Sequence, residues 1–227
     1  MNLTAPSGPP PPIDYAPPQD PYLPVLHADD HLIVVDKSSG LLSVPGKAAE
    51  HFDCVEYRAQ KQFSDARIVH RLDKDTSGIM VLARGAAAHR HLGLQFERRK
   101  VHKRYIARVW GAMEDDQGEV NLPLICDWPN RPKQMVDHER GKNARTQWHV
   151  LEREVDATRV LLLPHTGRSH QLRVHMLNLG HPILGDVLYA HAPALNAAER
   201  LQLHAESLSL HHPANGTVTT FTANCPF

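Results

Sequence analysis

Short apolar segments rich in β-branched residues recur along this chain, whereas only two segments have the periodicity of an amphipathic helix. The strands expected from these runs are residues 32–35, 78–83, 103–110, 145–151, 159–163, 207–210 and 218–221. The expected helices are residues 86–99 and residues 169–179, with Gly180 as a C-cap. Strands and helices do not alternate regularly, and no glycine-rich phosphate loop is present. The pattern therefore predicts an α+β fold with a mixed, largely antiparallel sheet flanked by helices and loops, rather than a doubly wound nucleotide-binding fold.

The proline distribution sets the expected domain boundaries. Half of the 18 prolines lie between Pro6 and Pro24, among few residues that could form a core. We expect residues 1–21 to be an extended or disordered proline-rich tail. A chain of 227 residues, 41% of them hydrophobic, can bury one substantial core. Residues 22–227 are therefore expected to form one catalytic domain.

Charge and cysteine usage restrict the class of protein. Lys and Arg together number 25, as do Asp and Glu, so any nucleic-acid surface must be local. The three cysteines form no C-x-x-C pair, and the 17 histidines show no metal-ligand spacing, so we expect no metal and no disulfide framework. Together with the lack of a long apolar run, this predicts a cytoplasmic protein that is neither secreted nor bound to a membrane.

Residues 70–78 combine charges, hydroxyls and a glycine between two β-branched runs, which is typical of a loop anchored by strands. Asp73 and Asp75 have two interpretations. Each could be a loop acid that accepts hydrogen bonds from nearby backbone amides. Each could instead be a catalytic carboxylate, and the position in the loop does not decide between these readings.

Residues 166–175 open the later helix with hydrogen-bond donors and no acid. Because helix N-termini that carry arginines attract anions, Arg168 and Arg173 could bind a phosphate or a carboxylate. The alternative is an ordinary amphipathic helix with an exposed basic face. Asp73 is a candidate for the negative partner.

Residues 98–105 carry the strongest local positive charge in the chain. Lys100, Lys103 and Arg104 could neutralise RNA phosphates, and Tyr105 could stack on a base extruded from its neighbours. Most charged runs are simply solvated surfaces, and that alternative also remains open.

Taken together, these three segments resemble the RluA family of pseudouridine synthases, over nearly the whole chain after the proline-rich tail. The family signature H-R-L-D-x-x-T-S-G is complete at His70–Gly78. The resemblance implies that Asp73 is the catalytic aspartate, that Arg173 is its ion-pair partner and that Tyr105 is the active-site tyrosine. It also implies that Arg71 fills the gap left by a flipped uridine.

The implied reaction converts uridine to pseudouridine in structured RNA. It neither adds nor removes atoms, so it requires no cofactor, in keeping with the missing dinucleotide loop. Residues 124–134 resemble the branch of the family that modifies both the transfer-RNA anticodon stem-loop and 23S ribosomal RNA. In this segment Trp128, Arg131 and Lys133 could lie against RNA, or the tryptophan could pack inside a structural loop. We expect a monomer.

Other interpretations and departures remain. Asp73 and Asp75 could form a carboxylate pair that hydrolyses an N-glycosidic bond in RNA. The chain could also be a non-catalytic RNA-binding or folding factor.

Family members commonly have proline where this chain has Ser38, so the loop at Ser38 could be less rigid than in those proteins. Residues 180–186 resemble a late structural turn of the family, and residues 203–205 resemble its last helix boundary.

Overall fold

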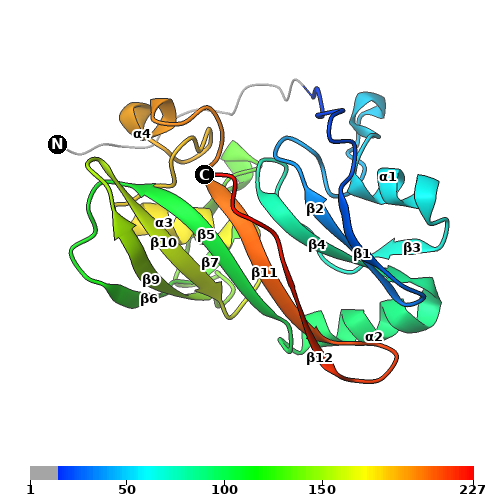
Figure 1. Cartoon of the computed structure of the whole chain (residues 1–227). Helices are drawn as coiled ribbons and strands as arrows, with labels where there is room; N and C mark the ends of the chain where they lie inside the picture. Colours follow the sequence, from blue (N-terminus) through cyan, green and yellow to red (C-terminus); the bar gives the residue numbers. More distant parts are fainter. Residues whose placement is uncertain (1–14) are drawn as a thin grey trace. The chain divides into compact units, whose positions relative to one another are not determined.

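The computed structural model describes residues 15–227, which form two compact units (Figure 1). The N-terminal unit combines residues 15–103 with residues 204–226 from the end of the chain. The central unit consists of residues 104–203, together with Phe227. The first 14 residues of the expected tail lie outside the described part of the chain.

The N-terminal unit is built on a mixed sheet. Its strands are β1 (Val25–Ala28), β2 (Leu32–Lys37), β3 (Ala66–Ile68), β4 (Ser77–Arg84), β11 (Leu203–His211) and β12 (Val218–Thr222). Figure 1 shows β1, β2 and β4 side by side, in the order β1-β2-β4-β11, while β3 pairs with β4 and β12 pairs with β11. All these pairs are antiparallel except β4 with β11, which is parallel. The helices are η1 (Ala49–His51), α1 (Val55–Gln62) and α2 (Gly85–Glu97).

The burial of β4 on both faces explains why its sequence is a nearly uninterrupted run of apolar residues. Its side chains are buried from Ser77 to Ala83 because α2, which follows it directly, packs against the same strand. Leu92 of α2 belongs to one core with Ile79 and Val81 of β4 and Val34 of β2. A strand buried on both faces cannot alternate apolar and polar residues.

The central unit contains an antiparallel sheet, a helix and a separate hairpin. The sheet order is β5-β10-β9-β6, formed by β5 (His102–Trp110), β10 (Ala157–Pro164), β9 (Arg145–Arg153) and β6 (Gln117–Asn121). The hairpin joins β7 (Leu124–Cys126) to β8 (Gln134–Val136) through η2 (Trp128–Asn130). The helices α3 (Gln171–Asn178) and α4 (Ala192–Asn196) complete the unit.

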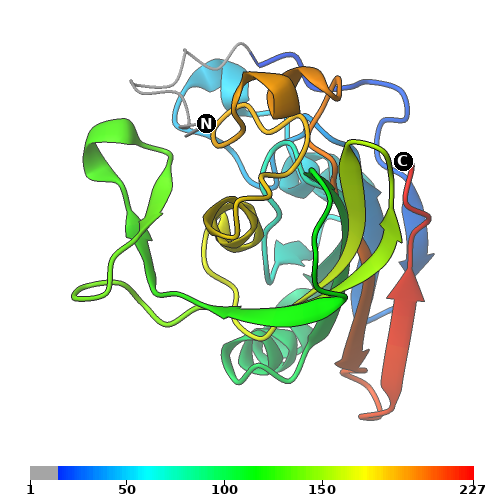
Figure 2. The ribbon, with the colours of Figure 1, turned by 90° about the vertical axis from the view of Figure 1, so that its left-hand side faces the viewer.

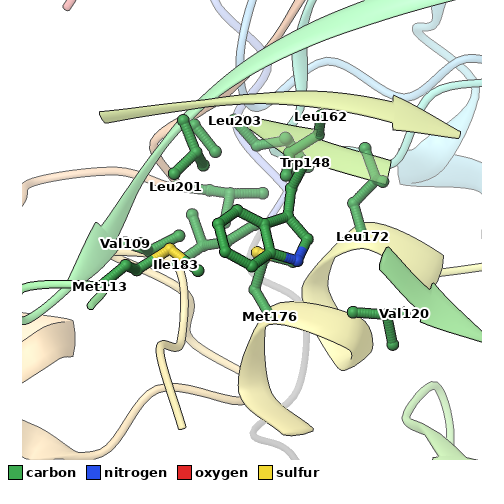
Figure 3. Close-up of a cluster of buried hydrophobic side chains, with 12 residues drawn as sticks. Val109, Met113, Val120, Trp148, Leu162, Leu172, Met176, Ile183, Leu201 and Leu203 are labelled. Atoms are coloured by element: carbon green, nitrogen blue, oxygen red, sulfur yellow. The ribbon is translucent and has the colours of Figure 1, made fainter. Parts of the chain in front are cut away.

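The core of the central unit lies between this sheet and α3. Figure 3 shows Trp148 of β9 among the side chains of Leu162, Leu172 and Met176. The indole fits closely against β6, since a Cβ atom on Gly118 would lie 2.6 Å from Trp148 Cζ2. A large aromatic ring can therefore cross the strand only where the strand has no side chain. This packing holds α3, and with it Arg173, against the sheet.

These observations confirm the predicted α+β class with a mixed, largely antiparallel sheet. All seven expected strands and both expected helices are present. Two boundaries were wrong: α3 begins at Gln171 because His170 has a left-handed backbone, with φ of 53°, and residues 203–205 begin β11 instead of marking a helix boundary. Among residues 15–227, no helix is long and apolar enough to cross a membrane.

Residues 15–21, which were expected in the tail, make specific contacts with α1 and with the segment before it. The hydroxyl of Tyr15 donates to the carbonyl of Asp53 and accepts from the amide of Leu42. The fully buried guanidinium of Arg58 pairs with Asp53 and donates to the carbonyl of Pro18 at 2.8 Å. A buried cation requires such acceptors. These contacts join residues 15–21 to the N-terminal unit, and the boundary at residue 22 stays a prediction.

Candidate active site

Asp73 lies in the loop between β3 and β4, and its side chain is half-buried. The amide of Thr76 donates to the carbonyl of Asp73 at 3.2 Å, which closes a tight turn. The partly buried pair Lys74-Asp75 forms the centre of this turn, a position that suits aspartate. The strand β4 then starts at Ser77, so the turn directly precedes a buried strand that lies between β2 and β11.

The backbone on both sides of Asp73 is bound by residues 37–43. The hydroxyl of Ser43 donates to the carbonyl of Leu72 at 2.6 Å and accepts from its amide at 3.1 Å. On the other side, the carbonyl of Lys74 accepts from Lys37 Nζ at 2.7 Å and from the amide of Gly40 at 2.9 Å. The residue between these two anchors has little freedom to move.

The ammonium group of Lys37 is fully buried. It donates to the carbonyls of Ser38 at 2.9 Å, Leu41 at 2.7 Å and Lys74 at 2.7 Å. Carbonyl oxygens arranged in this way offset the cost of removing a cation from water. The loop at Ser38 thus has fixed partners even though it lacks the proline that is common in the family.

The junction of β4 and β11 explains the Ser-Gly pair that ends the signature. Gly78 has φ of 110°, and a Cβ atom there would lie 2.3 Å from the carbonyl oxygen of Ala205. Only glycine permits this approach. Beside it, Ser77 Oγ and His204 Nδ1 are 2.9 Å apart. The signature glycine therefore serves the strand pairing that supports the loop.

His70 is an internal brace of the same loop. Its Nε2 accepts a hydrogen bond from the amide of Val81 at 2.9 Å, and its ring stacks on Phe96 with centroids 4.5 Å apart. Burial, followed by the nearby charge of Lys103, lowers the pKa of His70 from 6.5 to about 3. The imidazole is therefore a neutral acceptor that connects the loop to β4 and α2.

The lowered pKa of His70 predicts loss of stability in acid. The unfolded chain binds a proton at His70 below about pH 6.5 and the folded chain only near pH 3, so stability falls as pH decreases between these values. At pH 5 the free energy of unfolding should be about 2 kcal/mol lower than at pH 7.5 because of this group. We expect His70→Gln, which keeps an acceptor, to lose less stability than the unmodified protein between these two pH values. Urea unfolding of both proteins at pH 5 and pH 7.5 measures the difference. An equal loss of stability in His70→Gln and in the unmodified protein would contradict the prediction.

The predicted RNA-contact residues of the N-terminal unit differ in exposure. Arg71 and Lys100 are exposed, and neither side chain has a hydrogen bond or ion pair with any residue in the described range. Lys103 is half-buried, and burial lowers its pKa. Asp75, next to the catalytic candidate, pairs with Lys74 Nζ at 3.1 Å. Arg71 and Lys100 are thus accessible to phosphates, whereas Lys103 faces a drier environment.

The predicted residues on β5 belong to the central unit. Tyr105 is half-buried, lies opposite Leu162 of β10 and packs against the core shown in Figure 3. Arg104, the preceding residue, is exposed, as expected for alternation along a strand. The ring of Tyr105 is therefore supported from one side by a rigid sheet, which suits a stacking surface.

Arg173 of α3 forms a buried ion pair with Asp186. Its Nε donates to Oδ2 at 2.8 Å and its Nη2 to Oδ1 at 2.6 Å, and both side chains are at most 3% exposed. The amides of Leu188 and Tyr189 donate to Asp186 as well. This two-point geometry sets the plane of the guanidinium. Pairing of Arg173 with Asp73 stays a prediction.

Tyr189 connects this ion pair to neighbouring elements. Its ring lies 5.1 Å from Arg173 Cζ, and its hydroxyl is 2.7 Å from His170 Nδ1. The same hydroxyl accepts from the amide of Gln134 on β8 at 2.7 Å. Tyr189 therefore links α3 to the hairpin of β7 and β8.

The start of α3 is fixed by a buried polar network. Gln171 Oε1 accepts from the hydroxyl of Thr166 and the amide of Arg168, while its Nε2 donates to Thr146 Oγ1. Thr146 Oγ1 is also 2.9 Å from Nδ1 of His175, whose pKa is lowered by burial. Arg168 Nε itself donates to the carbonyl of Asn143. These bonds account for the cluster of polar residues at 166–175.

Three residues of the supporting structure were not predicted from the sequence. Asp186 was assigned only to a structural turn, although an acid among apolar residues is itself a signal of a buried partner. Lys37 and Ser43 were passed over because their partners are backbone carbonyls and amides, which have no sequence signature. The role of Asp73 and those of Arg71, Tyr105 and Arg173 stay predictions.

Comparisons with known proteins agree with this architecture. Residues 31–178 match the family described as RNA pseudouridylate synthase. The chain is 56% identical over 215 residues to the dual-specificity RNA pseudouridine synthase RluA of Escherichia coli K12, covering 94% of this chain and 98% of the relative. It is 51% identical to the protein of that name from Vibrio cholerae, covering 94% and 87%.

Solved structures give the same result at lower identity. Human RNA pseudouridylate synthase domain containing 1 superimposes with a TM-score of 0.77 at 26% identity, covering 93% of this chain and 87% of that one. Human RNA pseudouridylate synthase domain containing 4 superimposes with a TM-score of 0.71 at 27% identity, covering 89% of this chain and 88% of that one. The matched segment includes the Asp73 loop, β5 and α3. The chain belongs to the RNA pseudouridylate synthase family.

Proposed function

We propose that this protein isomerises specific uridines to pseudouridine in structured RNA, with Asp73 as the catalytic carboxylate. The observation that carries the proposal is the binding of the backbone on both sides of Asp73, at Leu72 and Lys74. A catalytic group must be held in place before the substrate arrives. The complete family signature around Asp73 supports the same assignment.

The reaction needs a positioned anion and a pocket for a flipped base. The bond from ribose to the base nitrogen breaks, the uracil turns, and a bond to carbon forms, so no atom is gained or lost. Asp73 acts as the nucleophile or base, and the guanidinium of Arg173 favours its anionic form. Arg71 fills the gap in the stack, and Tyr105 supports the extruded base. No cofactor is required.

The hydrolase alternative requires Asp73 and Asp75 to act as a pair. In the structure, however, Asp75 pairs with Lys74, and its carbonyl accepts from Ser39 Oγ at 2.7 Å. These contacts suit a loop acid. Product analysis of purified protein with a uridine-containing stem-loop tests the proposal: isomerisation leaves the RNA mass unchanged and yields pseudouridine, whereas hydrolysis releases free uracil. Release of uracil would overturn the proposed function.

We further propose two substrate classes, the transfer-RNA anticodon stem-loop and 23S ribosomal RNA. The support is similarity to several relatives that are named dual-specificity RNA pseudouridine synthases. We expect purified protein to form pseudouridine in both an anticodon stem-loop and a 23S fragment. Mapping pseudouridine in each RNA measures this, and modification of only one class would contradict dual specificity while leaving the isomerase assignment intact. We also propose that the protein is a cytoplasmic monomer.

The exposed cations Lys100 and Arg104 predict a salt-dependent affinity for RNA. Each phosphate contact that is lost should reduce the slope of log affinity against log salt by about 0.7 to 0.9. We expect Lys100→Ala and Arg104→Ala to flatten this slope, and Lys103→Ala to do so less because its ammonium is half-buried. Titration of a stem-loop RNA at several salt concentrations measures the slopes. Unchanged slopes in the first two variants would place the phosphate contacts elsewhere.

A further inference from the structure

The tip of the hairpin between β7 and β8 exposes a tryptophan. Trp128 of η2 is 65% exposed, whereas Trp148 in the core is 5% exposed. The alternative in which Trp128 packs inside a structural loop is therefore wrong. In Figure 2 the hairpin extends away from the sheet of the central unit and from α3. A large exposed aromatic ring on a projecting element is typical of an interaction site.

Hydrogen bonds hold the tip in one conformation. The amide of Asp127 donates to the carbonyl of Lys133, and the amide of Lys133 donates to the carbonyl of Asn130, each at 3.0 Å. Asn130 Nδ2 donates to Asp127 Oδ2 at 2.9 Å. The ring of Trp128 is thus carried by a closed, internally bonded turn. Such a ring binds a partner with little further ordering.

A cation lies on the indole. Arg131 Cζ is 4.4 Å from the centre of the Trp128 ring, and the Arg131 side chain is exposed. Among residues 15–227, it has no ion pair with a carboxylate. Since Arg131 covers one face of the ring and most of the residue is still exposed, the exposed area lies on the other face and at the edges. A planar apolar surface beside an uncompensated positive charge complements a base and its phosphate.

The base of the hairpin is attached to the element that carries Arg173. The amide of Gln134 donates to the hydroxyl of Tyr189, whose ring lies against Arg173. Leu124 and Val136 of the hairpin pack with Tyr189 and with Val174 of α3. The arm is therefore anchored to α3 by an apolar cluster and a hydrogen bond.

We propose that Trp128 and Arg131 form a binding site for one unpaired nucleotide of the RNA substrate, outside the position of the uridine that reacts. The base stacks on the open face of the indole, and the guanidinium of Arg131 lies beside the phosphate. This inference rests on the proposed function, because it takes RNA as the substrate. The uncompensated charge of Arg131 favours RNA over an apolar segment of a protein.

The test measures RNA binding without turnover. In full-length protein carrying Asp73→Asn, the affinity for a labelled anticodon stem-loop is determined by fluorescence anisotropy for Trp128→Ala, Trp128→Phe and Val155→Ala. Val155 is 96% exposed in the same unit and serves as the matched control. Stacking on a base is worth about 1–3 kcal/mol, so we expect Trp128→Ala to raise Kd by about 5- to 150-fold. Trp128→Phe should recover most of the affinity, and Val155→Ala should change nothing.

A second readout does not depend on the variants' affinities. Trp128 is the most exposed tryptophan, so acrylamide should quench its emission readily, and bound RNA should protect it. Trp128→Phe should remove the protected component. Unchanged affinity in Trp128→Ala together with unchanged quenching would overturn the proposal, as would protection by a peptide but not by RNA. Pseudouridine formation by the unmodified protein is assayed separately, so failure of the proposed reaction is distinguished from failure of this site.

Discussion

Asp73→Asn is expected to abolish pseudouridine formation while RNA binding is retained. The change removes the negative charge but keeps nearly the same shape, and the anchors at Leu72 and Lys74 use backbone atoms that the substitution does not alter. Loss of a positioned catalytic carboxylate should slow the reaction by about a thousandfold or more. Single-turnover assays at saturating RNA measure the rate, and anisotropy measures the affinity.

Asp75→Asn is the matched control, because this neighbouring acid pairs with Lys74. It should retain most of the activity. Turnover in Asp73→Asn comparable to that of the unmodified protein would remove Asp73 from the mechanism. Equal loss in both variants would favour the paired-carboxylate alternative, and the products would then show free uracil.

Arg173→Ala is expected to lose both stability and activity. The substitution leaves the buried carboxylate of Asp186 without its guanidinium, and removal of one partner from a buried ion pair typically costs about 3–5 kcal/mol. Activity should fall further because Arg173 is predicted to favour the anionic form of Asp73. Denaturant unfolding and single-turnover kinetics measure the two effects.

A double variant separates these effects. In Arg173→Met with Asp186→Asn, both charges of this buried pair are removed, and the Asn carbonyl can still accept from the amides of Leu188 and Tyr189. We expect most of the stability to return but the activity to stay low. Recovery of activity along with stability would show that Arg173 acts only through the fold.

The structure shows which features a sequence of this kind reveals. The β-branched runs predicted the strands correctly because their side chains are buried in the sheets. The helix α1 was missed because one of its three buried residues is Arg58, a charged side chain that breaks the apolar pattern. Strands β6, β7 and β8 are short and have few β-branched residues, so they gave no recognisable run.

The candidate site shows the same division. The loop around Asp73 and the start of α3 could be predicted as candidate sites, because polar residues capable of catalysis or binding cluster in both segments. Their supports were not visible. Lys37 and Ser43 act on backbone atoms, and Asp186 lies 13 residues from its partner Arg173. Such contacts depend on the tertiary fold, which cannot be predicted from local sequence patterns.

The discontinuity of the N-terminal unit has a consequence for biosynthesis. The strand β4, which follows the Asp73 loop, pairs with His204 and Ala205 of β11, and these residues leave the ribosome about 130 residues later than the loop. Residues 104–203 are continuous and can fold while the chain is still being made. The Asp73 loop therefore acquires its full support only after residues 104–203 have been synthesised.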